Sequence, residues 1–254
     1  MSGTFYGPCY RKTNGKTAVS ASGKSLDVMA NAWLLGLIVA GYFIGSIPFG
    51  LVVGLAKGID PRTSGSGNIG ATNVGRLLGG RYFALVFTLD LLKGMIPVLA
   101  AGAILHWEAA IARDYLLWLL VGAAAIVGHM FSIFLKFKGG KGVATSAGVL
   151  LGVFPYYTIP GIIAVVVFVA VFYTTRYVSL GSILGSIAFP LAYVAVGLVR
   201  NWPITRQQLP LLIFSVVIPA MIVYKHRANI ARLRAGTENR IAKRAAGGES
   251  VDVR

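Results

Sequence analysis

The chain has few residues that could build a metal site or a disulfide framework. It contains one cysteine, Cys9, with three histidines and eight acidic residues among 254 positions. One cysteine cannot form a disulfide within the chain, and no cysteine cluster is available for a metal. The acidic residues between positions 31 and 224 are Asp60, Asp90, Glu108 and Asp114, which are scattered over loops and apolar stretches. This distribution argues against a dimetal carboxylate site.

Charged residues are also scarce, at 13% of the chain, whereas a soluble domain carries about a quarter. Hydrophobic residues make up 56%, and the mean hydropathy is +0.73. A helix needs about 20 apolar residues to cross a hydrocarbon core of about 30 Å. The sequence therefore predicts an all-α integral membrane protein, a bundle of seven transmembrane helices in which one span is short. The apolar stretches cover residues 32–56, 82–106, 115–137, 143–154, 157–174, 178–199 and 209–224.

These stretches lie between two polar ends. Residues 1–30 are rich in Ser, Gly, Thr and Lys and lack the compact apolar region of a signal peptide, which predicts a disordered extension. Residues 31–240 then form the membrane domain, and residues 241–254 form a disordered basic tail. The short stretch 143–154 ends at Pro155, which disfavours a continuing helix.

Basic residues set the expected orientation. The net charge is +16, from 24 Lys and Arg against 8 Asp and Glu. Most of the excess lies in loops and in the C-terminal tail, where the positive-inside rule and attraction to anionic lipid account for it. The loops around Lys57 and Lys141 and the C-terminus are therefore expected inside, and the nearly neutral second loop and the N-terminus outside. No basic face with base-reading residues stands apart from the membrane, so we expect no nucleic-acid partner.

The first of three polar clusters follows the first apolar stretch. Residues 62–76 are dense in hydroxyls, amides and glycines, with an arginine at each end. A flexible linker would explain the Gly and Ser residues. It would not explain Asn68, Thr72, Asn73 and Arg76, which could line one turn and offer convergent donors to a polyhydroxy or phosphate ligand. We therefore favour a binding role for this segment.

The second cluster is the glycine-rich segment 137–145, Phe-Lys-Gly-Gly-Lys-Gly-Val-Ala-Thr. Gly139, Gly140 and Gly142 could let backbone N–H groups converge on a phosphate, and Lys141 adds charge. A helix that begins near Gly142 would add its positive end. The Walker spacing Gly-x-x-x-x-Gly-Lys-Ser/Thr is absent, which disfavours an ATPase. The alternative is a positive-inside loop with glycine for flexibility, and the run of three glycines favours the anion site.

The third cluster follows the last apolar stretch directly. If it is helical, His226 and Asn229 share one face, and Arg227 lies on another. A basic amphipathic tail on the inner leaflet would explain the arginines, but not His226, Asn229 and Glu238, which can all hydrogen-bond a ligand. On the expected topology the three clusters meet at the cytoplasmic surface, where an anionic, phosphorylated substrate could bind.

Other polar and small residues within the apolar stretches have structural interpretations. Asp90 and Lys93 are one turn apart, and because charge inside a membrane helix is costly and usually paired, we expect a structural ion pair. Recurring small residues, Gly36, Gly45 and Gly128 among them, predict close helix packing.

Three segments together resemble the cytoplasmic motifs of a known family. They are residues 66–73 (Ser-Gly-Asn-Ile-Gly-Ala-Thr-Asn), Gly128-His129 with residues 137–145, and residues 226–233 (His-Arg-Ala-Asn-Ile-Ala-Arg-Leu). In this order and membrane spacing they are similar to the motifs of the bacterial acyl-phosphate:glycerol-3-phosphate acyltransferases, the PlsY family. The resemblance covers the chain from about residue 32 to residue 240.

The resemblance implies an enzyme of membrane phospholipid synthesis. It would move a fatty acyl group from acyl phosphate to the 1-hydroxyl of glycerol 3-phosphate, giving lysophosphatidic acid and phosphate, with no metal or cofactor. It implies a multi-pass protein of the bacterial inner membrane, with the active site and C-terminus in the cytoplasm and the N-terminus in the periplasm. The expected partners are the two substrates, membrane lipid and, through functional coupling, the enzyme that makes acyl phosphate; the expected state is a monomer.

The resemblance also implies the site. The family's catalytic residues carry over to Ser66, Arg76, Lys141, His226 and Asn229. The acyl tail would lie in an apolar groove open to the inner leaflet. We expect direct attack by the glycerol hydroxyl, with a substrate phosphate oxygen or His226 as the base, and no acyl-enzyme on Ser66. The expected substrate-binding residues are Asn68, Thr72, Asn73, Gly139, Gly140, Gly142, Thr145, Arg227 and Glu238.

Three rival classes fit the sequence less well. A transporter of an organic phosphate would fit the many helices and the basic inner mouth, but it favours midplane polar residues and repeated halves. A phosphoalcohol transferase would need metal-binding aspartates. A structural membrane protein would not need three ligand-like clusters.

Overall fold

The computed structural model describes residues 21–105 and 111–241, and these two ranges contain helices and loops but no strand. A short 3₁₀ helix, Ile133–Leu135, lies in the loop between α5 and α6. The α-helices are α1 (Ala21–Ser46), α2 (Phe49–Leu55), α3 (Ala71–Leu78), α4 (Gly80–Leu105), α5 (Ala112–Met130), α6 (Val143–Gly152), α7 (Thr158–Thr175), α8 (Val178–Val199), α9 (Leu209–Lys225) and α10 (Arg227–Arg234).

Five segments of the described ranges are long and apolar enough to cross a membrane: Met29–Leu55, Gly80–Leu105, Ala112–Leu135, Thr158–Thr175 and Val178–Val199. The helices α9 and α10, which meet at a bend of 57°, make a sixth if they are counted as one span. The apolar helix α6 has only 10 residues, as expected for the short span. An all-helical, multi-pass membrane protein is therefore confirmed, whereas the count of seven crossings stays a prediction.

The first apolar stretch is divided at Pro48, because a proline has no N–H with which to continue the helical hydrogen bonding. The ammonium of Lys93 on α4 donates to the carbonyl oxygen of Ile47 (2.8 Å) and so provides a partner for a backbone group at this break. At the other end, α1 begins at Ala21, ten residues before the expected start of the membrane domain at residue 31. Residues 1–20 and 242–254 lie outside the described ranges, so the disorder expected there stays a prediction.

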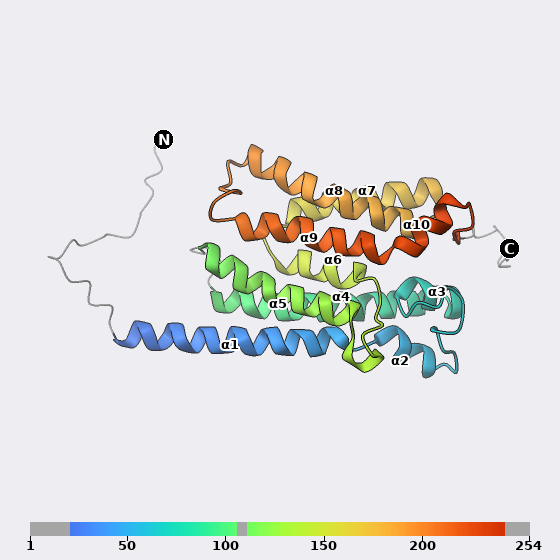
Figure 1. Cartoon of the computed structure of the whole chain (residues 1–254), viewed down its shortest axis with the longest axis horizontal. Coiled ribbons are helices and arrows are strands. Elements are labelled where there is room, and N and C mark those ends of the chain that lie inside the picture. The colour runs from blue at the N-terminus through green and yellow to red at the C-terminus, as the bar shows by residue number, and fades with distance from the viewer. Residues whose placement is uncertain (1–20, 106–110, 242–254) are drawn as a thin grey trace.

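The helices pack in two groups that run along the same axis (Figure 1). One group contains α1, α4, α5 and α6, and the other contains α7, α8 and α9. Glycine allows a close crossing between α1 and α5: a Cβ at Gly45 would overlap the backbone of Ala125, and one at Gly128 would overlap the carbonyl oxygen of Tyr42. This confirms the predicted close packing at these two glycines, whereas a Cβ at Gly36 would meet nothing within 4 Å.

Two aromatic side chains in the core of the bundle pair their polar atoms with backbone carbonyl groups, because membrane surroundings offer no water as a partner. The indole N–H of Trp118 donates to the carbonyl oxygen of Val98 (2.7 Å), and the hydroxyl of Tyr157 donates to that of Leu211 (2.6 Å). The ring of Tyr157 also packs edge-on against Phe189, with 5.0 Å between ring centroids. Trp118 and Tyr157 also belong to one cluster of buried hydrophobic residues, which draws on helices of both groups.

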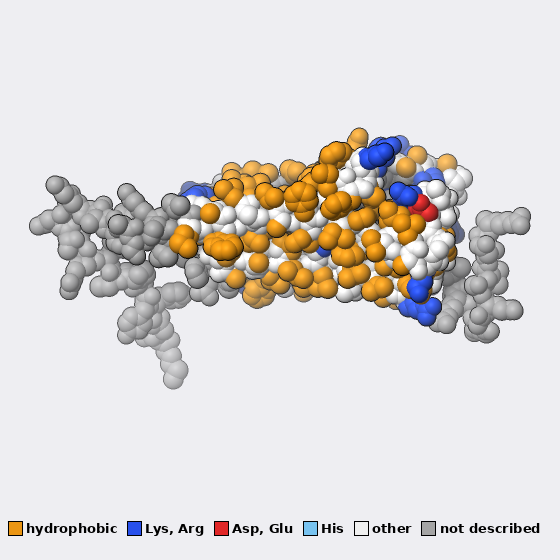
Figure 2. Space-filling view, turned by 90° about the horizontal axis from the view of Figure 1, so that it is seen from below, with side chains coloured by type: hydrophobic (Ala, Val, Ile, Leu, Met, Phe, Trp, Pro, Cys, Tyr) orange, Lys and Arg blue, Asp and Glu red, His pale blue; other side chains and the backbone are white. Residues whose placement is uncertain are grey.

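Most Lys and Arg side chains visible in Figure 2 gather at the end of the molecule where α3 and α10 lie, and hydrophobic side chains cover the middle. Acidic Asp60 and Glu238 also lie at this end, and each is paired with an arginine: Asp60 with Arg62 and Glu238 with Arg232, both at 2.7 Å. The bundle therefore has one strongly basic end, at which the three polar clusters meet.

Candidate active site at the basic end of the bundle

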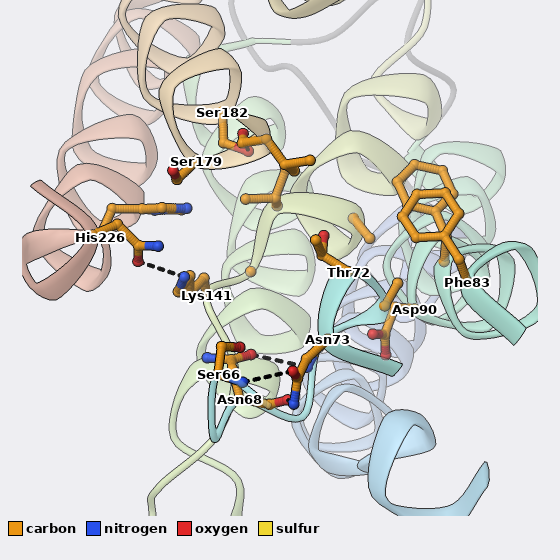
Figure 3. Close-up of a pocket in the computed structure, with 18 of the residues that line it drawn as sticks. Ser66, Asn68, Thr72, Asn73, Phe83, Asp90, Lys141, Ser179, Ser182 and His226 are labelled. Carbon is orange, nitrogen blue, oxygen red and sulfur yellow. Dashed lines mark hydrogen bonds between the residues drawn. The ribbon is translucent and has the colours of Figure 1, made fainter. Parts of the chain in front are cut away.

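A cavity of about 130 Å³ opens at the basic end, and residues from all three polar clusters line it (Figure 3). The convergence predicted from the sequence is therefore confirmed. The predicted site residues that line the cavity are Ser66, Asn68, Thr72, Asn73, Arg76, Lys141, Gly142, His226, Asn229 and Glu238.

The first cluster owes its shape to Asn73 on α3, whose side chain is buried. Its amide nitrogen donates to the carbonyl oxygens of Pro61, Ser64 and Asn68, at 3.0, 3.1 and 2.8 Å. Its amide oxygen accepts the backbone N–H of Ser66 at 2.8 Å. Both polar atoms of Asn73 are thus used within the protein. These bonds fold the loop that presents Ser66, and because Asn73 also lines the cavity, its contact with substrate stays a prediction.

Asn68 and Arg76 occupy the same wall of the cavity. The side-chain oxygen of Asn68 accepts the N–H of Gly70 (2.9 Å), which caps the turn into α3. Arg76 follows one turn after Thr72 and donates to the carbonyl oxygen of Asn239 (3.2 Å), so it links α3 to the segment after α10. Its guanidinium has further donors that this contact does not use.

At two positions of the glycine-rich segment, the backbone N–H groups donate to carbonyl oxygens of the protein itself. The N–H of Gly139 donates to the carbonyl oxygen of Met130 (3.2 Å), and the N–H of Gly140 to that of His129 (3.0 Å). A Cβ at Gly140 would also overlap the imidazole of His129. These two glycines are therefore needed for close packing on the end of α5. They do not line the cavity, and their contact with a phosphate stays a prediction.

Gly142 does line the cavity, and its φ of +82° is one that favours glycine. It is the N-cap of α6 and provides no side-chain cap, so the first N–H groups of this helix are left for a ligand or water. Val143 and Ala144, the first two residues of α6, also line the cavity. The predicted anion site at the positive end of a helix thus rests on Gly142 and α6 alone.

Lys141 begins a chain of hydrogen bonds across the cavity. Its ammonium donates to the side-chain oxygen of Asn229 (2.6 Å), and the Asn229 amide nitrogen donates to Oε1 of Glu238 (2.6 Å). The same carboxylate accepts the hydroxyl of Ser179 (2.7 Å) on Oε1 and Nε of Arg232 (2.7 Å) on Oε2. Asn229 and Glu238 are both buried. Glu238 therefore acts as the anchor that orients Asn229 and, through it, Lys141.

The charges around Lys141 set its protonation. Burial lowers the pKa of Lys141 to about 8, Arg232 and Arg76 act in the same direction, and Glu238 opposes them. The ammonium is thus charged at neutral pH but holds its proton less firmly than an exposed lysine. A bound phosphate would raise this pKa, because an anion stabilises the charged form.

His226 lies at the bend between α9 and α10, with its side chain toward the cavity (Figure 3). Its Nδ1 lies 2.8 Å from the carbonyl oxygen of Ile222, so a neutral ring carries its proton there and leaves Nε2 as an acceptor. Burial lowers the pKa of His226 to about 4, and Lys141 adds to the effect. The imidazole is therefore neutral at pH 7 and a weak base.

Two further predicted residues lie away from the cavity. Thr145 is fully buried on α6, next to Gly94 of α4, and does not line the cavity. Arg227 is exposed, and its guanidinium lies 4.7 Å from the ring centroid of Tyr224. Thr145 points into the helix packing and Arg227 lies on the other face of α10 from Asn229, and their contacts with substrate stay predictions.

The sequence interpretation missed other residues of the cavity. Ser179 and Ser182 lie near the start of α8, on the side of the helix toward Lys141 (Figure 3). Asp90 and His129 also line the cavity, with Asp90 Oδ1 2.7 Å from Lys93 Nζ and 3.7 Å from His129 Nδ1. The predicted Asp90–Lys93 ion pair is confirmed. The i, i+3 spacing of the two serines at the start of an apolar helix was a signal for the missed pair.

An apolar groove of about 240 Å³ adjoins the cavity and runs between α6, α7, α8 and α9. Its far end is lined by Leu150, Gly161, Phe189 and Phe214. Val165 and Val169 of α7 line its side, and because they are 55% and 39% exposed, the groove opens onto the lipid-facing surface there. The predicted groove between spans is therefore present.

Metal binding has no support in the described ranges, which hold no group of three or more His, Cys, Asp or Glu side chains that could bind a metal ion. The cavity instead offers ammonium, guanidinium, amide, hydroxyl and free N–H donors next to an apolar groove. This arrangement suits a ligand with an anionic head and a fatty tail.

Comparison with known proteins agrees with this chemistry. The sequence model of the glycerol-3-phosphate acyltransferase family matches residues 35–236. The glycerol-3-phosphate acyltransferase of Geobacter sulfurreducens is 46% identical over 208 residues, which cover 80% of this chain and 95% of the relative. That of Aquifex aeolicus is 43% identical over 209 residues, which cover 81% and 98%.

Solved structures give the same result. The crystal structure of PlsY, an integral membrane glycerol 3-phosphate acyltransferase, in its glycerol 3-phosphate form superposes with a TM-score of 0.70 at 40% identity. The alignment covers 82% of this chain and 96% of that one. The lysophosphatidic acid form of PlsY gives a TM-score of 0.68 at the same identity. The chain therefore belongs to the glycerol-3-phosphate acyltransferase family, of the PlsY type.

Proposed function

We propose that the protein transfers a fatty acyl group from acyl phosphate to the 1-hydroxyl of glycerol 3-phosphate, giving lysophosphatidic acid and inorganic phosphate. The observation that carries this proposal is the continuity of two cavities of opposite character. The polar cavity and the apolar groove share Phe87, Val143, Phe168 and Ser182 in their linings. A molecule with an anionic head and an acyl tail fits both at once.

The dimensions of the groove suit an acyl chain. From the shared wall to the far end, α6 runs from Val143 to Leu150 and α8 from Ser182 to Phe189, seven residues each. At 1.5 Å per residue both give a length of roughly 10 Å. One leaflet of the hydrocarbon core is roughly 15 Å deep, so the groove holds about two thirds of a chain that crosses it. The remainder leaves through the open side along α7.

The polar residues divide into a clamp, whose side chains bind the substrates, and residues that hold the clamp in place. Lys141 and Arg76 supply the charge that neutralises phosphate, and Ser66, His226 and Asn229 supply hydrogen bonds to glycerol 3-phosphate. The free N–H groups at the start of α6 hold the phosphate of the acyl donor, with Gly142 giving it room. Asn68 and Thr72 line the wall of the polar cavity, whereas Glu238 acts indirectly, by orienting Asn229.

The reaction needs little more than position and charge. Acyl phosphate is a mixed anhydride, so phosphate leaves readily once its charge is neutralised. The hydroxyl of glycerol 3-phosphate attacks the acyl carbon directly, with no acyl-enzyme on Ser66. Because the pKa of His226 is lowered to about 4, a substrate phosphate oxygen is the better proton acceptor, and the role of His226 is to hold glycerol 3-phosphate.

The basic end of the bundle faces the cytoplasm of a bacterial cell in this proposal. Positive charge remains on the inner side of the membrane, and both substrates are anions that would be steered to it. The C-terminus lies on the same side, and the N-terminus is periplasmic. The site is complete within one chain, which supports a monomer coupled functionally to an enzyme that supplies acyl phosphate.

A donor assay tests this function. Protein purified in detergent is given labelled glycerol 3-phosphate with acyl phosphate or with acyl-CoA, in the presence of a metal chelator. Labelled lysophosphatidic acid is expected with acyl phosphate alone. Formation of product from acyl-CoA and none from acyl phosphate would refute the proposed donor. A need for added metal would refute the proposed mechanism.

A further inference from the structure

The wall shared by the polar cavity and the apolar groove fixes where the reacting carbon lies. In an acyl phosphate, the carbonyl carbon joins the phosphate to the hydrocarbon chain. If the phosphate lies in the cavity and the chain in the groove, this carbon must pass the shared residues, Phe87, Val143, Phe168 and Ser182. This step rests on the proposed function. It places the carbonyl next to one polar side chain of the shared wall, Ser182.

We propose that Ser182 is a further catalytic residue, whose hydroxyl donates a hydrogen bond to the carbonyl oxygen of the acyl donor as that oxygen gains charge. Ser182 is buried, at 5% exposure, and lies one turn from Ser179 on the same face of α8. Ser179 is held by the Glu238 carboxylate at 2.7 Å. The α8 backbone is thereby tied to the clamp, and Ser182 lies one turn deeper, where the chain begins.

The hydroxyl of Ser182 is available for this role. It donates to the carbonyl oxygen of Val178 (2.9 Å), one turn back along α8. That backbone oxygen belongs to the helix, and a serine hydroxyl can rotate from such a contact to a stronger acceptor. A carbonyl oxygen that becomes an oxyanion is such an acceptor, because a hydrogen bond to a charged group is about twice as strong as a neutral one.

The electrons and the proton balance without another reactant. The glycerol oxygen forms a bond to the acyl carbon, and the π pair moves to the carbonyl oxygen, which Ser182 stabilises. The pair then returns, the bond from carbon to the phosphate oxygen breaks, and the leaving phosphate keeps its electrons. The hydroxyl proton passes to a phosphate oxygen. Ser182 keeps its own proton throughout and forms no covalent bond.

The chain contains a matched control for this proposal. Ser186 lies one turn further along α8 and makes the same kind of contact, donating to the carbonyl oxygen of Ser182 at 2.7 Å. It lines the apolar groove and not the polar cavity. Ser182→Ala and Ser186→Ala therefore each remove a hydroxyl and its hydrogen bond to the preceding turn of the helix. Ser182→Ala does so next to the proposed position of the substrate carbonyl, and Ser186→Ala does so one turn beyond it.

Steady-state rates with acyl phosphate and glycerol 3-phosphate test the proposal. Removal of one oxyanion donor costs roughly a hundredfold to a thousandfold in kcat. We expect Ser182→Ala to lose at least tenfold in kcat with an unchanged KM for glycerol 3-phosphate, Ser186→Ala to lose clearly less in kcat than Ser182→Ala, and Ser182→Thr to recover part of the loss.

Equal effects of the two alanine variants, or a change in KM alone, would overturn the role of Ser182. Binding of lysophosphatidic acid, measured by calorimetry, should be unchanged in Ser182→Ala, and a matching loss of binding would also overturn it. Failure of the wild-type protein to use acyl phosphate at all would refute the proposed function instead.

Discussion

Glu238 provides the sharpest test of how the site is held together. Its two carboxylate oxygens accept three hydrogen bonds, from Ser179, Asn229 and Arg232, at 2.6 to 2.7 Å. Glu238→Gln keeps the shape of the side chain but replaces one acceptor oxygen with an amide group that can only donate. Whichever way the new amide turns, at least one of the three donors then faces another donor.

The magnitude follows from the bonds lost. A hydrogen bond to a charged group contributes roughly 1.5–3 kcal/mol, and each 1.4 kcal/mol is about a factor of ten. If Asn229 shifts, Lys141 loses the side-chain oxygen that orients its ammonium at 2.6 Å. We therefore expect kcat/KM for glycerol 3-phosphate to fall roughly tenfold to a hundredfold.

The assay measures initial rates of lysolipid formation by purified protein in detergent at varied glycerol 3-phosphate. Ser179→Ala is the matched control, because it removes one donor and leaves the carboxylate with Asn229 and Arg232; its loss should be smaller. Thermal unfolding should show that both variants are folded. Wild-type kcat/KM in a folded Glu238→Gln protein would refute the argument that this carboxylate orients the clamp.

Four further predictions concern single residues. Lys141→Ala should lower kcat/KM roughly tenfold to a hundredfold, whereas Lys138→Ala, at an exposed position, should cost less than about threefold; equal small effects on steady-state rates would contradict the clamp. Because the pKa of Lys141 is about 8, its charge is present below that pH and lost above it, so kcat/KM should fall as pH rises through about 8, and a pH profile of Lys141→Arg should be flatter. His226→Gln should lower kcat less than about tenfold, since loss of a general base costs roughly a hundredfold or more; a larger loss would make histidine the base. Gly140→Ala should destabilise the protein by about 1–3 kcal/mol in denaturant unfolding because its Cβ overlaps His129, and unchanged stability would contradict the packing.

Much of the fold could be predicted from the sequence, because bilayer physics leaves few choices for long apolar stretches. Hydropathy located the spans, and Pro155 marked the end of the short helix α6. The break at Pro48 and the start of α1 at Ala21 were harder to predict. Both depend on partners elsewhere in the bundle or on weak local propensity, which a hydropathy pattern does not report.

The position of the site could be predicted from the sequence, but the roles of its individual residues were harder to predict. Residues from distant clusters were expected to converge, and they do. The roles of Asn73 and Glu238 depend on three-dimensional partners: one folds a loop, and the other anchors a neighbouring amide. Gly139 and Gly140 looked like a phosphate nest, but their N–H groups bond to the end of α5. Composition cannot separate a glycine that makes room for a ligand from one that makes room for a helix.

The side of the groove along Val165 and Val169 remains uncovered by protein. A fatty tail can therefore slide sideways between the groove and the surrounding lipid, without threading end-first through a tunnel or crossing water. Donor and lysolipid would arrive and depart within the same leaflet, while the small water-soluble reactant and the released phosphate exchange through the polar mouth. Molecules with a fatty tail would thus reach the reaction centre from the lipid, and the small polar molecules would reach it from water.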